Sequence, residues 1–261
     1  MTRHDSWRTL RNGTSTDVVL AVDFFAPGRV EASFDDLAPR LTPVRTVQET
    51  GQPPHGAETG MMGEDYLSFW LDGLDPSLTV RGILGFCVGG VYASALGARL
   101  AQRSGVLPAM VLFDPEPITG WVLRWQYHKV LQRLAQVLSP EELSAAEAAG
   151  GVAEEEISDL PALGDRLIKL YAEAGHMGLA RFGLDQARRE EMLGLFDSYM
   201  SYLVGASQIT TAADTSTTTV ISSDAPTVGV TLGTHQLAFD MDRHELLRAP
   251  EVAAAVSGIL G

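Results

Sequence analysis

The 261-residue sequence predicts an α/β protein with a mostly parallel sheet that is interrupted by a block of helices. Three observations support this prediction. Strand and helix patterns alternate over residues 1–119, only helical patterns occur over residues 120–206, and strand and helix patterns return over residues 207–261. Most of the strand-like runs are apolar throughout, as is typical of strands covered on both faces. We therefore expect a two-part α/β core and one helical insertion.

The first part of the core carries four strand signals, which are β-branched or apolar runs bounded by turn residues. They cover residues 17–22, 44–47, 80–85 and 108–113. Helical spacing of apolar residues occurs between them, over residues 34–41, 64–71 and 91–102. Pro39 limits the length of the first of these helices.

The inserted block contains helical patterns over residues 121–137, 163–174 and 185–204. Between the first two of these, Ser139-Pro140-Glu141-Glu142 predicts a further helix start, with Ser as the N-cap, Pro at the first position and Glu at the third. Gly175 is suitably placed to end the helix before it. The aromatic and Met side chains of the block either line an apolar channel or pack helix against helix, and their spacing leaves both interpretations open.

The last part of the core is predicted to contain two strands and a closing helix. The strands cover residues 217–223 and 228–232, and the helix covers residues 250–260. With this assignment His235 lies on the loop after the last strand, at the carboxyl edge of the sheet.

Composition and charge exclude several classes of protein. The chain has 19 basic and 33 acidic residues and a net charge of −14, so it repels phosphate backbones and we expect no nucleic-acid partner. A single cysteine excludes an internal disulfide. The most apolar stretch, residues 79–100, is interrupted by Arg81 and several glycines and does not resemble a membrane span. Since the N-terminal residues are polar and show no secretory signal, we expect a cytoplasmic protein without a membrane partner.

The motif with the clearest chemistry is Gly85-Phe86-Cys87-Val88-Gly89-Gly90, which follows a predicted strand and opens a predicted helix. This is the context of a nucleophile elbow, G-x-S-x-G, with Cys in place of Ser. The residues two before and two after the nucleophile must be small to avoid the adjoining helix, and both are glycine. The helix N-terminus is expected to favour the thiolate. The alternative is that Cys87 is an inert buried cysteine on a glycine-rich turn.

A cysteine nucleophile needs a base and a group that orients the base. We predict His235 as the base, because ligands meet such sheets at the carboxyl edge. His244 lies among charged residues beside the last helix, and we expect it to be solvated. Asp114, 27 residues after Cys87 and at the end of the next strand, is the predicted orienting acid. Asp224, after the strand at residues 217–223, is the alternative, and either aspartate is also a common turn residue.

The oxyanion of an acyl-transfer intermediate is expected to be held by two backbone N–H groups. One is that of Val88, directly after the nucleophile. The other comes from the loop after the first core strand, where Pro27 has no N–H to offer. Phe25 or Ala26 must then donate, and we assign Ala26.

The order of elbow, Asp after the next strand, helical block and late His resembles the α/β-hydrolase thioesterase domains of polyketide synthases and nonribosomal peptide synthetases. The resemblance covers residues 17–260 and implies an α/β-hydrolase fold with a helical lid and a Cys87–His235–Asp114 triad. It also implies a reaction that releases, cyclises or transfers an acyl chain from the phosphopantetheine arm of an acyl or peptidyl carrier protein, with no cofactor or metal of the enzyme's own.

The sequence departs from that family at Cys87, where most members have Ser. A Cys-bound acyl group is a thioester, which is more prone to aminolysis than a Ser ester, so the exchange favours transfer to amines or other nucleophiles in addition to hydrolysis. The elbow is also similar to that of dienelactone hydrolases and polyhydroxyalkanoate synthases, which place the acid after a later strand. A small-ester or lactone hydrolase is therefore an alternative, as is a non-catalytic binding protein of the same fold.

Overall fold

The computed structural model describes residues 6–24, 31–54, 57–58, 60–210, 214–225 and 227–261. The chain divides into two compact units. The first comprises residues 1–53, 63–117 and 209–261, and the second comprises residues 54–62 and 118–208. In the described part of the chain, no helix combines the length and the apolar character needed to cross a membrane.

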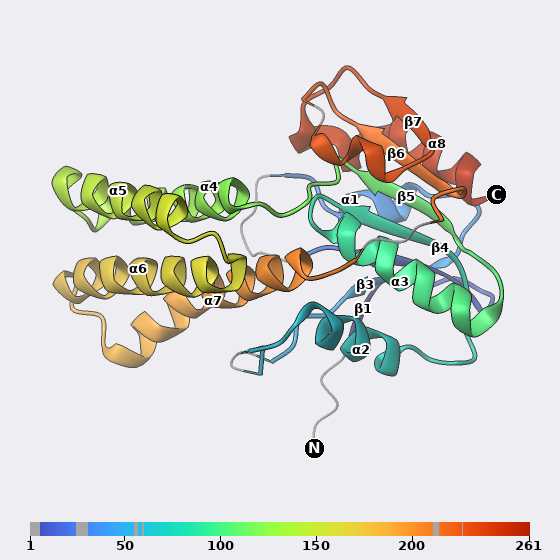
Figure 1. The fold of residues 1–261 in the computed structure, drawn as a ribbon. Helices are drawn as coiled ribbons and strands as arrows, with labels where there is room; N and C mark the ends of the chain where they lie inside the picture. Colours follow the sequence, from blue (N-terminus) through green and yellow to red (C-terminus); the bar gives the residue numbers. More distant parts are fainter. Residues whose placement is uncertain (1–5, 25–30, 55–56, 59, 211–213, 226) are drawn as a thin grey trace. The chain divides into compact units, whose positions relative to one another are not determined.

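The first unit is built on a seven-stranded sheet with the order β1-β3-β2-β4-β5-β6-β7 (Figure 1). The strands are β1 (Trp7–Arg11), β2 (Asp17–Val22), β3 (Thr46–Thr50), β4 (Thr79–Phe86), β5 (Ala109–Phe113), β6 (Thr218–Ser222) and β7 (His235–Ala238). Strand β1 pairs antiparallel with β3, and each of the other pairs is parallel. The prediction of a mostly parallel α/β sheet is confirmed, although the short strand β1 carries no apolar run and was not predicted.

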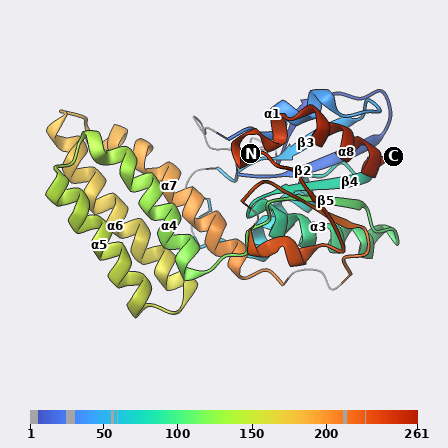
Figure 2. The ribbon, with the colours of Figure 1, turned by 90° about the horizontal axis from the view of Figure 1, so that it is seen from above.

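Helices cover both faces of this sheet (Figure 2). On one face lie α2 (Gly63–Gly73) and α3 (Gly89–Ser104), and on the other lie α1 (Phe34–Leu37) with the turn η1 (Ala38–Arg40) and the closing helix α8 (Pro250–Leu260). On the α2–α3 face the ring of Tyr92 packs edge-on against Trp70 at 5.2 Å. On the other face Phe34 packs edge-on against Phe113 at 5.9 Å. The buried central strands therefore fit the predicted all-apolar runs.

The second unit contains four long helices, α4 (Gly120–Leu131), α5 (Pro140–Glu156), α6 (Leu160–Arg181) and α7 (Gln186–Ser207), and the turn η2 (Gln132–Gln136). The predicted start of α5 is confirmed: the hydroxyl of Ser139 accepts from the Glu142 N–H, and the Glu142 carboxylate accepts from the Ser139 N–H. The prediction that Gly175 ends a helix is wrong. Helix α6 continues through Gly175, and the glycine allows α7 to pack closely there, because a β-carbon would clash with Leu193.

The aromatic side chains of the second unit divide into two groups. Tyr127, Tyr171 and Phe196 are buried, and the last two rings lie 4.4 Å apart. Trp121 and Trp125 are exposed and stack on one another at 5.9 Å along α4. Packing of helix against helix accounts for the buried group.

The predicted strand over residues 228–232 is wrong. These residues form a 3-10 turn, η3 (Val228–Leu232), and the last strand begins at His235. Gly229 lies against Pro115, where a β-carbon would come within 2.6 Å of the Pro115 carbonyl carbon. Val228 is 76% exposed, so its apolar character does not reflect burial. All four residues of β7 are exposed, so no apolar run marks the strand in the sequence.

Candidate active site

Cys87 lies on a sharp turn between β4 and α3. Its φ is 53°, in the left-handed region that costs a non-glycine residue about 1–3 kcal/mol. Its N–H donates to the carbonyl of Phe113 at 2.9 Å and ties the turn to β5. A β-carbon on Gly85 would come within 2.7 Å of the Gly90 Cα, and one on Gly89 within 2.8 Å of the Val22 carbonyl carbon. The steric need for small residues on both sides of Cys87 is thus confirmed.

The thiol of Cys87 is half-buried, and its Sγ lies 3.4 Å from the Glu116 Oε2, to which it donates a hydrogen bond. Burial raises the pKa of the thiol to about 12, and the Glu116 carboxylate adds to this shift. Arg243 and the backbone N–H of Val88 oppose it by favouring the charged form. The N–H of Val88, at the N-terminus of α3, favours the charged form as expected, but burial has the larger effect on the pKa of the thiol.

Asp114 occupies the carboxyl end of β5, beside the turn that carries Cys87. Its side chain is completely buried and its φ is 38°, which is a second left-handed position. The Oδ1 accepts from the N–H of Ser223 at 3.0 Å, whereas the buried Oδ2 has no hydrogen-bond partner in the described part of the chain. An unpaired buried acceptor costs about 1–3 kcal/mol. The Oδ2 of Asp114 can therefore accept a further hydrogen bond.

His235 does not lie where the sequence predicted it. It pairs with Thr219, which pairs with Val111, which in turn pairs with Leu84. His235 is thus level with a residue three positions before Cys87, and it lies three strands away. With a strand spacing of about 4.8 Å and a rise of about 3.3 Å per residue, the two Cα atoms are roughly 17 Å apart. The structure does not bring His235 to Cys87 or Asp114.

The other predicted site residues have separate positions. Val88 is the N-cap residue of α3, and its backbone N–H faces the Cys87 sulfur. Phe25 and Ala26 lie outside the described residues. Asp224 is exposed, and its N–H donates to the carbonyl of Met241 at 3.0 Å.

Arg243 is a site residue that sequence reasoning missed. It begins the turn η4 (Arg243–Arg248), which follows β7 and precedes α8. Its Cζ lies 5.3 Å from the centroid of the Phe86 ring, and its guanidinium interacts electrostatically with Cys87, Glu116 and Asp114. The signal in the sequence was its place after the last strand, but that place becomes visible only when β7 is assigned correctly.

His244, the next residue, lies at the same carboxyl edge of the sheet. Its carbonyl accepts from the N–H of Ala32, just after the segment that follows β2, at 2.8 Å. Its half-exposed imidazole has Nδ1 2.6 Å from the Asp242 carboxylate and Nε2 3.9 Å from that of Glu31. Of His235 and His244, the two histidines described in the first unit, His244 is therefore the one at the edge that carries Cys87.

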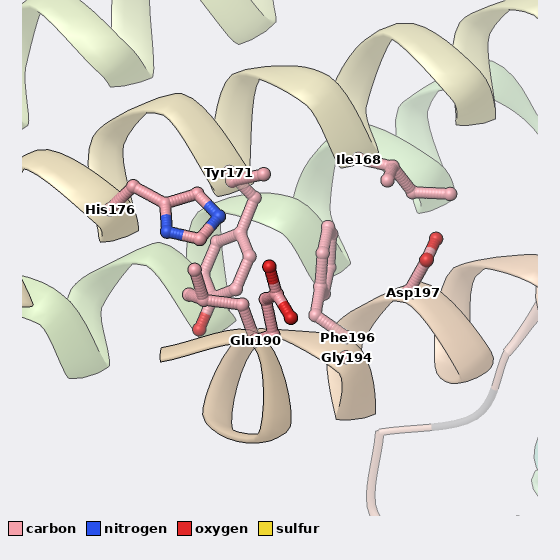
Figure 3. Close-up of a pocket in the computed structure, with 9 residues that line it drawn as sticks. Ile168, Tyr171, His176, Glu190, Gly194, Phe196 and Asp197 are labelled. Carbon is pink, nitrogen blue, oxygen red and sulfur yellow. The ribbon is translucent and has the colours of Figure 1, made fainter. Parts of the chain in front are cut away.

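The second unit holds a separate cavity of about 310 Å³ between α6 and α7 (Figure 3). Figure 3 shows the imidazole of His176, the phenol of Tyr171 and the carboxylate of Glu190 turned toward the same space. Ile168 and Leu193 contribute apolar lining. Within the described residues, no three His, Cys, Asp or Glu side chains are grouped so as to hold a metal ion.

No family model and no curated protein matches the sequence. Among solved structures, the chain is similar to the Vlm2 thioesterase domain with genetically encoded 2,3-diaminopropionic acid bound with a dodecadepsipeptide, at 17% identity and a TM-score of 0.55 over 98% of each chain. It is also similar to the NocB thioesterase domain from the nocardicin cluster, at 13% identity and a TM-score of 0.55 over 98% of this chain and 99% of that one. At these identities the comparison establishes the fold: the chain has the α/β-hydrolase fold.

Proposed function

We propose that this protein is a thioesterase or acyltransferase of natural-product biosynthesis. It accepts an acyl chain from the phosphopantetheine thioester of an acyl or peptidyl carrier protein onto Cys87, and it then releases, cyclises or transfers that chain. The observation that carries the proposal is Cys87 on its left-handed turn beside Asp114, whose buried Oδ2 has no hydrogen-bond partner among the described residues. The likeness in fold to two thioesterase domains supports it.

The base in this proposal is His244 and not His235, because the register of β7 keeps His235 away from the carboxyl edge. In the structure the His244 imidazole is bonded to Asp242, and the adjacent Arg243 takes the inward position. In this proposal the imidazole leaves Asp242 and turns toward Cys87 during catalysis. The Oδ2 of Asp114 then accepts the imidazole N–H and orients the ring.

In the first step, His244 takes the proton of the Cys87 thiol, and the thiolate forms a bond to the carbonyl carbon of the acyl thioester. The N–H of Val88 stabilises the oxyanion, with Ala26 as the expected second donor. The tetrahedral intermediate then loses the pantetheine sulfur, which leaves with the proton from the imidazolium. In the second step, water, a hydroxyl or an amine gives a proton to His244 and attacks the acyl group, and the thiol of Cys87 is restored.

The acyl-enzyme in this scheme is a thioester, because the nucleophile is sulfur. Its energy is close to that of the incoming thioester, and amines attack it more readily than they attack an oxygen ester. The proposal therefore includes transfer to an amine or another nucleophile besides hydrolysis. The helical unit has the role of the substrate lid in this scheme.

The thioesterase proposal fits the structure better than a dienelactone-hydrolase-like activity on small esters or lactones. That alternative places the acid after a later strand, where this chain has Asp224. Asp224 is exposed and its backbone bonds Met241, whereas Asp114 is buried beside Cys87.

The proposal is tested by intact-protein mass spectrometry after incubation with acyl-pantetheine surrogates. The native protein is expected to gain the mass of the acyl group, and Cys87→Ala is expected to gain none. The same adduct on both proteins, or on neither across a range of acyl chains, would overturn the proposal.

A further inference from the structure

We propose that Arg243 and Glu116 are positioning residues that set the charge state of Cys87, with the guanidinium favouring the thiolate and the carboxylate favouring the thiol. This inference rests on Cys87 being the nucleophile proposed above. It adds to the site two residues that are not members of the proposed triad, and it assigns them opposite effects on the ionisation of Cys87.

Glu116 is held against Cys87 by two contacts. Its Oε2 accepts a hydrogen bond from Sγ at 3.4 Å, and its backbone N–H donates to the Cys87 carbonyl at 3.2 Å. The backbone contact fixes the carboxylate beside the sulfur. When the thiol ionises, Glu116 loses the S–H donor and faces a second negative charge, so its carboxylate stabilises the protonated form.

Arg243 approaches the same sulfur from η4. Its Cζ lies 5.3 Å from the centroid of the Phe86 ring, and an aromatic face holds a guanidinium by a cation–π interaction. Phe86 directly precedes Cys87, so the ring that holds the cation also places it next to the nucleophile. A positive charge at this position stabilises the thiolate.

The charged groups around Cys87 indicate in which direction each substitution shifts the balance between thiol and thiolate. Glu116 is acidic and Arg243 is basic, both act electrostatically on Cys87, and Arg243 also interacts with Glu116 and Asp114. Asp23, from the segment after β2, has its carboxylate on the N–H of Phe24. With Arg243 removed, the sulfur loses the positive charge that opposes Glu116, whereas with Glu116 neutralised the guanidinium acts on the sulfur without that opposing charge.

With Glu116 in contact with the sulfur, Cys87 stays protonated and unreactive toward adventitious electrophiles. An acyl thioester that enters the site displaces the Glu116 carboxylate from Sγ, and Arg243 is then left to stabilise the thiolate that attacks.

The test measures the rate of iodoacetamide alkylation as a function of pH on the full chain. Cys87 is the only cysteine in the sequence, so alkylation reports on it without background. Glu116→Gln is expected to move the titration midpoint of the thiol down by about one pH unit, and Arg243→Met is expected to move it up by about as much, each a roughly tenfold change in rate at fixed pH. Arg248→Met is the matched control, because Arg248 lies on the same turn but pairs with Glu245 and Asp36.

Arg243→Lys keeps the charge and is expected to hold the midpoint near that of the native protein, which separates a charge effect from a packing effect. Circular dichroism verifies that each variant is folded. Shifts in the same direction for Glu116→Gln and Arg243→Met, or no shift in either, would overturn the inference. Alkylation needs no acyl substrate, so the two proposals can fail separately. Opposite shifts without any acyl adduct would sustain this inference and defeat the proposed function. An acyl adduct without opposite shifts would sustain the proposed function and defeat this inference.

Discussion

The carboxyl edge of the sheet has two halves that differ in burial and in how they position side chains. Cys87 and Asp114 lie on left-handed turns directly after the buried carboxyl ends of β4 and β5. At the end of β6 and β7, the last strand is exposed along its whole length, and the site is approached from the turn that begins at Arg243. In the first half, steric constraints within the strand–turn segments position the side chains. In the second half, contacts between segments far apart in the sequence position them.

This difference explains why the position of Cys87 was predictable and that of His235 was not. The glycines beside Cys87 are required by contacts within one strand–turn–helix segment. The position of His235 depends on where β7 begins, and an exposed edge strand of four residues leaves little trace in hydropathy.

The largest expected effect separates the two histidines. His244→Asn removes the proposed base, so turnover of an acyl-pantetheine surrogate is expected to fall by about 10²- to 10⁴-fold. His235→Asn changes an exposed residue far from Cys87 and is expected to leave turnover within about twofold, since surface substitutions usually change free energies by less than 0.5 kcal/mol. Steady-state kinetics of both variants make the comparison. A loss confined to His235→Asn would show that β7 adopts another register in the active protein.

Gly89→Ala probes the steric limit at the central turn. A β-carbon there would press on the Val22 carbonyl group, which is backbone and cannot yield, so we expect a loss of about 3 kcal/mol or more in the free energy of unfolding. Gly258→Ala on α8 is the control, because nothing lies within 4 Å of its added methyl group, and it is expected to stabilise by up to about 1 kcal/mol. Urea unfolding measures both, and equal effects would mean that the turn is not closely packed.

The buried thiol predicts a dependence of stability on alkaline pH. The pKa of Cys87 rises from its ordinary value of 9.0 to about 12 in the folded chain, so above pH 9 the unfolded chain releases a proton that the folded chain keeps. The native protein should therefore lose stability relative to Cys87→Ser as pH rises through this window, by about 2 kcal/mol at pH 10.5. Thermal or urea unfolding of both proteins from pH 7 to 10.5 measures the difference, and parallel curves would contradict it.

The smallest effect is expected on the outer strand. Leu237→Ala shortens a side chain that is exposed on β7, so we expect a loss below about 1 kcal/mol. Leu112→Ala on β5 shortens a fully buried side chain and is expected to cost about 2–5 kcal/mol. If urea unfolding gave similar losses for both, β7 would be packed more tightly than its exposure indicates.

Much of the fold could be predicted from local signals. The apolar runs of β2, β4, β5 and β6 marked the buried strands, the Ser139 capping box marked the start of α5, and the glycines at 85 and 89 marked the elbow. These features depend on residues close together in the chain, whose steric and hydrogen-bonding needs are the same in any surroundings.

The sequence by itself determined the parallel core, the inserted helices and the turn that carries Cys87. Only the tertiary structure decided that β1 joins the sheet, that residues 228–232 form a 3-10 turn, and that Arg243 and Glu116 meet at the thiol. The physical reason is that these last features arise from pairing and charge contacts between distant segments. An exposed strand or a single arginine acquires its environment from those partners, and its own neighbours in the chain do not specify it.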